Sequence, residues 1–421
     1  MNEKLNVFYE DIKVGELERG EELTLSFQYS DQWLSFTNRF QLSLAMPFQK
    51  ESFGNKITLS FFENLLPEGE VRKTIANNHK IESPYEFLRE FGRDCAGAIL
   101  LTDKNVSPNL NRTGAEVELQ LEKIYKAIKD KQSVAEVISE ENPGYLSIAG
   151  AQDKFPANYK NGNFYIPKDG SPTTHIVKVP IFRSGVKESI FNEFYCMKLA
   201  RLVGLEVPEV SILDDGKHPL FIIERYDRIK NKNGTFNRLH QQDFCQAQGV
   251  VSEMKYEVKG GPTIKDNYNI VTKNVGIKTR KSATFSFLDW LCFNLLIGNN
   301  DSHSKNISLL LFDGKIELAP YYDLLCTEIY PKLTKQFSFQ VGGRNDSSRI
   351  GKNQLNKLEE ELGLKSGTVI ERMILMKEKL LENKDILAKE LNEKYPRVKI
   401  VNRISEFIEK RCKNLCRQGI E

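Results

Sequence analysis

The sequence lacks the long apolar run that a membrane-spanning helix requires, because no stretch of about 18 consecutive apolar residues occurs in its 421 residues. Residues 1–10 contain no apolar segment of the kind found in a secretory signal. Charge of one sign is not in excess either: 60 Lys and Arg face 57 Asp and Glu, which leaves a net charge of +3. We therefore expect no transmembrane segment, and the net charge alone indicates no nucleic-acid partner.

Metal-ligating residues are few and scattered. There are five histidines and seven cysteines, and among the cysteines only Cys412 and Cys416 lie close together. No histidine follows that pair, so its spacing does not fit a zinc site. The odd cysteine count and the ample apolar content (40% of residues) argue against a disulfide scaffold. We interpret all seven cysteines as reduced and expect a cytoplasmic protein.

The chain is long enough for two or three domains at about 150 residues each. Its first hundred residues resemble a small α+β unit, with a helix at 83–91 that has Ser83 as its cap, Pro84 in the first turn and Glu86 three residues after the cap. The turn-forming residues of 103–114 indicate a loop or a domain boundary. The other elements expected in this part are strands at 7–9, 23–29 and 97–102 and a helix at 60–67.

The rest of the chain changes from mixed to helical. Apolar residues at a helical period predict a helix over 187–203, and residues 351–421 are charged and helical in pattern. Strands are expected at 163–166, 174–179, 210–213, 219–224, 307–311 and 315–318. This order favours a small sheet lobe followed by a larger helical lobe.

The most informative stretch is Gly298-Asn-Asn-Asp-Ser-His-Ser-Lys-Asn306, which follows an apolar helix. Asp301 and Asn306 are five residues apart, and Asp323 comes just after the expected hairpin. Phosphoryl transfer from ATP needs one carboxylate for the attacking hydroxyl, and a second carboxylate with an amide oxygen for magnesium. The order matches the catalytic loop of protein kinases, with Asp301 as base and Asn306 and Asp323 as metal ligands. The alternative is a turn-rich loop in which Asn and Asp serve as caps.

A kinase also needs a lysine and a loop for the phosphates. Lys178 lies in an apolar strand, and Glu193 on the following helix could pair with it. From the strand alone, an edge or snorkelling lysine is the better interpretation. Residues 147–154 supply small side chains and one glycine, and this segment is equally consistent with a phosphate loop and a plain turn. Residues 221–228 fit either a hinge that offers backbone groups to adenine or a buried strand with an ion pair.

These residues resemble the HipA family, the serine/threonine kinase toxins of bacterial HipA–HipB toxin–antitoxin pairs. The matching segments run in family order from about residue 61 to 323. Besides the catalytic loop they are Phe61-Phe-Glu-Asn-Leu-Leu-Pro67, Gly92-Arg-Asp-Cys-Ala-Gly-Ala98, Ser147-Ile-Ala-Gly-Ala-Gln152, Thr173-Thr-His-Ile-Val-Lys-Val-Pro180, Asn192-Glu193, Gly204-Leu-Glu-Val-Pro208, Glu224-Arg-Tyr-Asp-Arg228 and Tyr322-Asp323.

The resemblance implies a two-lobed, protein-kinase-like α+β fold with an extra N-terminal subdomain. The expected domains are 1–110 for the α+β subdomain, 111–226 for the mixed-sheet kinase N-lobe and 227–421 for the mostly helical C-lobe. ATP and Mg²⁺ are the implied cofactors. The residues implied to bind ATP are Ser147, Ile148, Ala149, Gly150, Ala151, Gln152, Lys178, Glu224, Tyr226 and His303, of which Glu224 and Tyr226 act through backbone groups.

The resemblance also implies regulation and partners. Ser147 looks like the autophosphorylated serine that ejects the phosphate loop and switches the enzyme off. The implied target is a protein, with an aminoacyl-tRNA synthetase as the known class, and growth arrest and persistence as the outcome. The implied partner is a small helix-turn-helix antitoxin of the HipB type, and through it operator DNA. Two other hypotheses stay open: a small-molecule phosphotransferase, and a catalytically idle binding module that helps a repressor on DNA.

Overall fold

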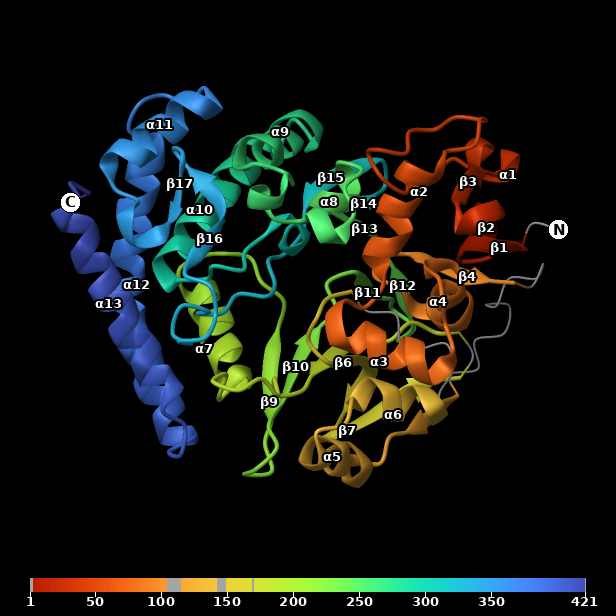
Figure 1. Ribbon diagram of the computed structural model, residues 1–421, viewed down its shortest axis with the longest axis horizontal. Coiled ribbons are helices and arrows are strands. Elements are labelled where there is room, and N and C mark those ends of the chain that lie inside the picture. The colour runs from red at the N-terminus through yellow and green to blue at the C-terminus, as the bar shows by residue number, and fades with distance from the viewer. Residues whose placement is uncertain (1–2, 104–114, 142–148, 169, 421) are drawn as a thin grey trace. The chain divides into compact units, whose positions relative to one another are not determined.

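The computed structural model describes residues 3–103, 115–141, 149–168 and 170–420. They form two compact units, each built from segments that are separated in the sequence (Figure 1). The first unit contains Met1–Pro180, Ser211–Ser252 and Leu309–Ile316, and the second contains Ile181–Val210, Glu253–Ser308 and Glu317–Glu421. Among the described helices, none has both the length and the apolar character needed to span a membrane.

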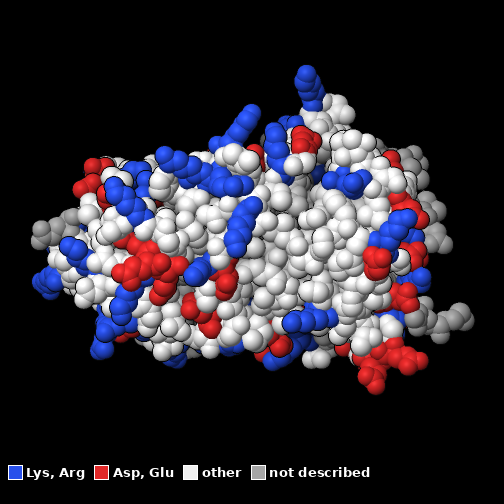
Figure 2. All heavy atoms as spheres, turned by 90° about the horizontal axis from the view of Figure 1, so that it is seen from above, with Lys and Arg blue, Asp and Glu red and all other residues white. Residues whose placement is uncertain are grey.

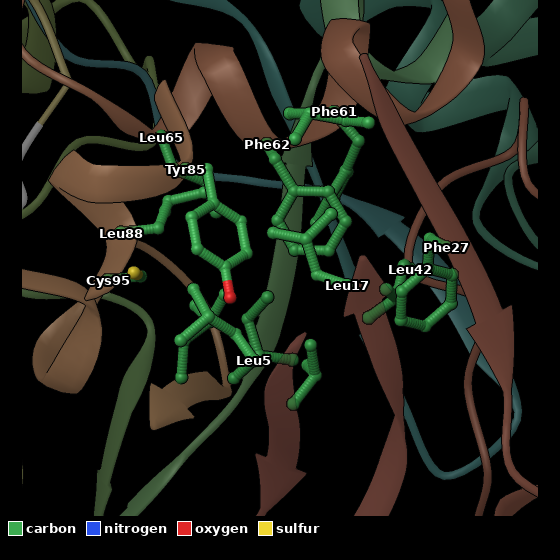
Figure 3. Close-up of a cluster of buried hydrophobic side chains, with 14 of the residues drawn as sticks. Leu5, Leu17, Phe27, Leu42, Phe61, Phe62, Leu65, Tyr85, Leu88 and Cys95 are labelled. Carbon is green, nitrogen blue, oxygen red and sulfur yellow. The ribbon is translucent and has the colours of Figure 1, made fainter. Parts of the chain in front are cut away.

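The first unit begins with an antiparallel sheet of strand order β3-β2-β1-β4. Its apolar side chains pack against the helices that follow β3 and form one core, part of which Figure 3 shows. The predicted cap of α4 is confirmed, because Ser83 Oγ accepts a hydrogen bond from the Glu86 N–H at 3.3 Å. The elements are β1 (Glu3–Tyr9), β2 (Ile12–Arg19), β3 (Leu25–Tyr29), β4 (Ile99–Thr102), α1 (Asp31–Ser35), α2 (Asn55–Phe62), α3 (Gly69–His79) and α4 (Pro84–Phe91).

A second sheet in this unit has six strands in the order β5-β7-β6-β8-β10-β9. Two helices pack on it and complete a second apolar core around Phe155, Phe164 and Val177. The elements are β5 (Glu116–Glu118), β6 (Lys154–Lys160), β7 (Asn163–Pro167), β8 (His175–Lys178), β9 (Val210–Leu213), β10 (Leu220–Glu224), α5 (Leu121–Asp130) and α6 (Val134–Glu141). Because β8 lies between β6 and β10, its backbone is hydrogen-bonded on both sides.

Smaller elements complete the first unit. Asp313 and Gly314 both have positive φ, +49° and +68°, as the tight turn of the predicted 307–318 hairpin requires. The β14 strand pairs with β13 as well as with β15. The elements are β11 (Arg228–Lys230), β12 (Phe236–Arg238), β13 (His240–Asp243), α8 (Phe244–Ala247), β14 (Ser308–Phe312) and β15 (Lys315–Leu318).

The second unit is mainly helical, as predicted for the second half of the chain. The α10 helix is apolar around most of its circumference and is correspondingly buried, and α12 packs against it. Figure 1 shows the long helices α12 and α13 side by side. The elements are α7 (Ser189–Leu202), α9 (Ile264–Asn274), α10 (Arg280–Ile297), β16 (Gln336–Val341), β17 (Arg344–Asp346), α11 (Lys352–Leu362), α12 (Thr368–Lys394) and α13 (Ile400–Arg417).

Surface charge follows the balanced composition. Figure 2 shows basic and acidic side chains interspersed on the face of the molecule that it presents. This distribution agrees with the near equality of 60 basic and 57 acidic residues.

Candidate active site

The predicted catalytic loop begins where α10 ends. Gly298 caps this helix with φ of +72°, a left-handed conformation that glycine adopts without strain. A Cβ at this position would lie 2.6 Å from the ring of Phe407 on α13, so a side chain does not fit. Backbone conformation and packing together therefore make the chain leave the helix at this residue and start the polar segment 299–306.

This polar segment is buried except at one residue. Of residues 299–306, all of which the structure describes, Asp301 is exposed while the other seven are at most 7% exposed. The buried polar groups are held by hydrogen bonds: Asn300 N–H donates to Thr327 Oγ1 at 2.8 Å, and Ser338 Oγ–H donates to the Asn300 carbonyl at 2.8 Å. A loop fixed in this way presents the Asp301 carboxylate to solvent from a rigid base.

Asn299 ties the candidate catalytic residues together. Its side-chain oxygen accepts a hydrogen bond from the Asp301 N–H at 3.3 Å, and its side-chain nitrogen donates to the Asp323 carbonyl at 3.1 Å. The Asn306 amide nitrogen donates to the Asp301 carbonyl at 3.0 Å. Asp301, Asn306 and Asp323, which were predicted from their spacing, are therefore brought together by direct bonds and by one bridging side chain.

Asp323 has an unusual backbone. Its φ of +54° lies in the left-handed region, which residues other than glycine adopt infrequently. Conformations of this kind persist where the surrounding structure imposes them, and they cluster at functional sites. The bond from Asn299 to the Asp323 carbonyl contributes to that constraint.

The residues fit a magnesium site of the kind used with nucleotides. The side-chain nitrogen of Asn306 donates to the Asp301 carbonyl. The ligands that would hold the ion are the amide oxygen of Asn306 and the carboxylate of Asp323. Mg²⁺ takes one or two such oxygen ligands and fills its other positions with water and substrate phosphates. Within the described ranges, no cluster of three or more His, Cys, Asp and Glu residues could hold a metal ion by itself.

His303 lies inside the loop and is 5% exposed. Its backbone N–H donates to the Asp301 carbonyl at 3.0 Å, and its backbone carbonyl accepts from the backbone N–H of Asn306 at 2.9 Å. Its ring meets the ring of Tyr256 edge-on, with centroids 5.1 Å apart. The histidine predicted to contact the nucleotide is thus part of the turn that shapes the candidate catalytic loop.

Tyr256 is a site residue that the sequence reasoning missed. Its hydroxyl donates to Asp301 Oδ1 at 2.5 Å. The signal that could have found it is its position in a polar, turn-forming segment, Lys255-Tyr-Glu-Val-Lys-Gly-Gly-Pro262, directly before a capped helix. A large aromatic residue in such a segment has no obvious core to fill.

Lys178 is the last residue of β8, in the first unit, and is 4% exposed. Its register partners are Lys154 on β6 and Phe221 on β10, so it belongs to an inner strand of the sheet. This position rules out the interpretation as an edge lysine. Glu193, its proposed partner, lies on α7 in the second unit and is 2% exposed, and the pairing itself stays a prediction.

The predicted phosphate loop is described in part, because Ser147 and Ile148 lie outside the described residues. The Ala149 carbonyl accepts from Lys154 Nζ at 2.8 Å, and the Gly150 carbonyl accepts from the Glu68 N–H at 3.0 Å. Gln152 Nε2 donates to the Val179 carbonyl at 2.8 Å, next to Lys178. Gly150 has φ of +111°. The segment that also includes Ala151 is therefore anchored at several points beside the end of β8.

The predicted hinge leaves the sheet at Glu224, which ends β10 and is exposed. Among the next four residues, Tyr226 is partly buried and hydrogen-bonds the side chain of Gln241, whereas Arg225, Asp227 and Arg228 are buried. The predicted burial and ion pairing are therefore correct for these three residues, although Arg225 and Asp227 lie in the turn after β10 and not in a strand. This arrangement does not exclude a hinge whose backbone binds adenine.

The three residues belong to a larger buried ionic cluster. Asp94 accepts from Arg225 at 3.1 Å, from Arg228 at 3.0 Å and from Arg238 at 3.2 Å, and all four side chains are at most 2% exposed. Burial alone would raise the pKa of Asp94, but the three guanidinium groups outweigh that effect and hold its pKa well below the usual range. Burial is also the largest influence on Arg228, and it lowers the pKa of this residue to about 10.

Comparison with known proteins identifies the class. The sequence matches the profile of the HipA-like C-terminal domain over residues 146–383 and that of the HipA N-terminal domain over residues 5–102. It is 33% identical over 368 residues to the putative kinase Y4mE of Sinorhizobium fredii, with 86% of each chain covered. It is 29% identical over 376 residues to the serine/threonine-protein kinase toxin HipA of Shewanella oneidensis, with 86% of this chain and 84% of that protein covered.

A solved structure is similar over nearly the whole chain. It is the complex of the Shewanella oneidensis MR-1 toxin–antitoxin proteins HipA and HipB with operator DNA, and it matches with a TM-score of 0.83 and 25% identity over 98% of this chain and 97% of that one. The chain belongs to the HipA family. The predicted kinase-like α+β fold class is thereby confirmed, and so is the prediction of a kinase, since the relatives that cover most of the chain are named kinases.

Proposed function

We propose that this protein is an ATP- and Mg²⁺-dependent serine/threonine protein kinase that acts in the cytoplasm as the toxin of a HipA–HipB-like pair. The observation that carries the proposal is the segment 299–306, where Asp301 is exposed on an otherwise buried polar loop and is tied to both Asn306 and Asp323. Membership of the HipA family supports the same activity.

Asp301 is the proposed catalytic residue. It accepts the proton of the substrate hydroxyl while the hydroxyl oxygen attacks the γ-phosphorus, and the bond from that phosphorus to the bridging oxygen breaks to release ADP. Asn306 and Asp323 are the proposed metal ligands, and bound Mg²⁺ would neutralise charge on the phosphates. His303 is proposed to contact the nucleotide.

The first unit supplies the other proposed ATP-binding groups. Lys178 is proposed to bind the phosphates, with Glu193 as its partner, and the segment 147–152 is proposed to cover them. Glu224 and Tyr226 are proposed to bind adenine through backbone groups. The proposed domain boundaries remain 1–110, 111–226 and 227–421.

Ser147 is the proposed regulatory phosphosite. A phosphoryl group adds about −1.5 to −2 charges to a segment that is proposed to hold the phosphates of ATP. Repulsion of the nucleotide would then switch the enzyme off. If Ser147→Ala blocks autophosphorylation but activity still decays with ATP as in the wild type, this regulation is refuted.

The proposed partner is a HipB-like helix-turn-helix antitoxin, and through it operator DNA. The similarity over 98% of the chain to HipA from the complex with HipB and its operator DNA supports this proposal. The proposed substrate is a protein, for which an aminoacyl-tRNA synthetase is the first class to test, with growth arrest and persistence as the result.

The experiment is intact-mass measurement of the full chain before and after incubation with Mg-ATP, for the wild type and Asp301→Ala. We expect a gain of one phosphoryl group at Ser147 in the wild type alone. Equal gain in both proteins would refute the role of Asp301. Turnover of ATP without any label in protein would favour a small-molecule phosphotransferase, and no turnover by a chain that starts unphosphorylated would favour the binding module.

A further inference from the structure

The Tyr256 side chain, which lies outside the catalytic loop, is hydrogen-bonded to the Asp301 carboxylate. The bond from its hydroxyl to Asp301 Oδ1 measures 2.5 Å, which is at the short end for an O–H donor and a charged acceptor. It engages one carboxylate oxygen, and a carboxylate has a second oxygen that can receive the proton of a substrate hydroxyl. The contact can therefore fix the plane of the carboxylate without using both of its oxygens.

The backbone around Tyr256 is folded tightly. The Tyr256 carbonyl accepts from the N–H groups of Lys259 at 3.0 Å and of Gly261 at 3.1 Å. A Cβ on Gly261 would lie 1.8 Å from the Met254 carbonyl oxygen, so the turn closes only with glycine at this position. Such a turn restricts the movement of the tyrosine, whereas a side chain that had to move out of the site in each catalytic cycle would need a more flexible segment.

One strand supports both the tyrosine turn and the catalytic loop. The Gln340 N–H of β16 donates to Glu257 Oε2 at 2.8 Å, and Ser338 of the same strand donates to the Asn300 carbonyl at 2.8 Å. Glu257 follows Tyr256, and Asn300 precedes Asp301. Because β16 is hydrogen-bonded to the residue next to Tyr256 and to the residue next to Asp301, this strand fixes the distance between the tyrosine hydroxyl and the carboxylate.

A second link comes from the helix that follows the turn. Asn267 on α9 exchanges hydrogen bonds with Ser304 of the catalytic loop, at 2.9 and 3.2 Å. Thr263 caps α9 only two residues after Gly261, with a reciprocal bond between Thr263 and Asp266. The ring of Tyr256 also rests edge-on against His303. The strand β16, the helix α9 and this ring contact thus hold the turn against the loop.

We propose that Tyr256 is a positioning residue for phosphoryl transfer, which orients the Asp301 carboxylate toward the substrate hydroxyl through its own hydroxyl. The inference rests on the proposed function of Asp301. A carboxylate that loses this bond rotates about its terminal torsion, and the productive orientation becomes a smaller fraction of its population. The substitution should slow the chemical step and leave the binding of ATP intact.

The test compares Tyr256→Phe with the wild type, using the full chain, Mg-ATP and single-turnover autophosphorylation followed by intact mass. Phenylalanine keeps the ring and its contact with His303 and removes the hydroxyl alone. We expect the single-turnover rate to fall about 10- to 100-fold, the range for a lost hydrogen bond to a charged group. The dissociation constant of Mg-ATP and the melting temperature should stay within about twofold and about 2 °C of the wild type.

Tyr268→Phe is the matched control. Tyr268 is a partly buried tyrosine on α9 whose ring contacts Phe287, and its substitution should leave the rate unchanged. Asp301→Ala in the same assay separates the two proposals. If Asp301→Ala is fully active, the proposed function of Asp301 is refuted. If Asp301→Ala is inactive and Tyr256→Phe reacts at the wild-type rate, only the role of Tyr256 is refuted.

Three other outcomes would overturn the inference. A faster Tyr256→Phe enzyme would mean that the tyrosine blocks the position of the substrate hydroxyl. Phosphate found on Tyr256 would mean that its hydroxyl is an acceptor. A rate loss accompanied by an equal loss of ATP affinity would mean that the tyrosine supports nucleotide binding and not the orientation of Asp301.

Discussion

The buried ionic cluster around Asp94 predicts a large loss of stability when one carboxylate is neutralised. Its groups are the guanidinium groups of Arg225, Arg228 and Arg238 and the carboxylates of Asp94 and Asp227, so its formal charge is +1. Asp94→Asn leaves three buried cations and one anion. Removing one partner from a buried ion pair costs about 3–5 kcal/mol, and with three partners affected we expect about 4 kcal/mol.

The assay is hydrogen exchange of the peptides that contain β8 and β10, which report on the opening of the first unit. A loss of about 4 kcal/mol corresponds to roughly thousandfold faster exchange. Removing one excess cation as well, in Asp94→Asn with Arg238→Met, should recover part of the loss, because the formal charge returns to +1.

An exposed ion pair provides the control. Lys73 Nζ lies 2.8 Å from Glu70 Oε1, closer than any arginine lies to Asp94, but the two side chains are 71% and 86% exposed. Glu70→Gln should therefore leave exchange unchanged. If Asp94→Asn accelerates exchange less than about tenfold, or no more than Glu70→Gln does, burial does not govern the energetics of this cluster.

Three further predictions concern other parts of the chain. Burial lowers the pKa of His240 to about 4, below the ordinary value near 6.5, so the unfolded state takes up the proton at a higher pH than the folded state does. The contribution of this residue to stability is therefore complete above about pH 6.5. It is lost, by about 3 kcal/mol, as the pH falls toward 4. Urea unfolding across this range should show a flatter pH dependence for His240→Gln, and equal slopes would contradict the prediction. Arg411→Met breaks the largely buried ion pair with Glu328 and should cost about 3 kcal/mol in urea unfolding, whereas Lys410→Met, at an exposed site on the same helix, should cost nothing measurable. In Gly298→Ala the new side chain meets both a left-handed φ and the ring of Phe407, and the free energy of unfolding should fall by more than about 2 kcal/mol. In Gly216→Ala the φ is also left-handed but the space is open, and the free energy of unfolding should fall by about 1 kcal/mol. Similar losses in the two variants would mean that packing is irrelevant at Gly298.

The parts of the site that could be predicted from the sequence are local. Asp301 and Asn306 share one short segment between an apolar helix and a hairpin, so spacing alone indicated their association. Tyr256 reaches Asp301 across 45 residues, through a turn and a strand support that no periodicity reveals. Asp94 and Arg225 lie in two of the segments that resemble the HipA family and are 131 residues apart in the sequence. Only the folded chain shows that these two side chains form an ion pair.

The fold was predictable to a similar degree. Long periodic segments such as α7 and the helices after 351 were found, and so was the capped helix α4. The strand expected from Leu23 begins at Leu25, because Leu23 ends a 3₁₀ turn with φ of +59°. The strand β2 was missed, since Gly15 and the charged residues around it weaken the strand pattern, although its pairing with both β1 and β3 stabilises it.

The interleaving of the two units has a consequence for synthesis of the protein on the ribosome. The strand β13 is made early but pairs with β14, which belongs to the segment Leu309–Ile316. At about 5–20 residues per second, roughly 3–13 s separate the translation of these two strands, during which β13 lacks this neighbour. Because an unpaired strand edge invites association with other chains, nascent chains truncated between residues 252 and 309 should be more prone to aggregation than those that extend past 316.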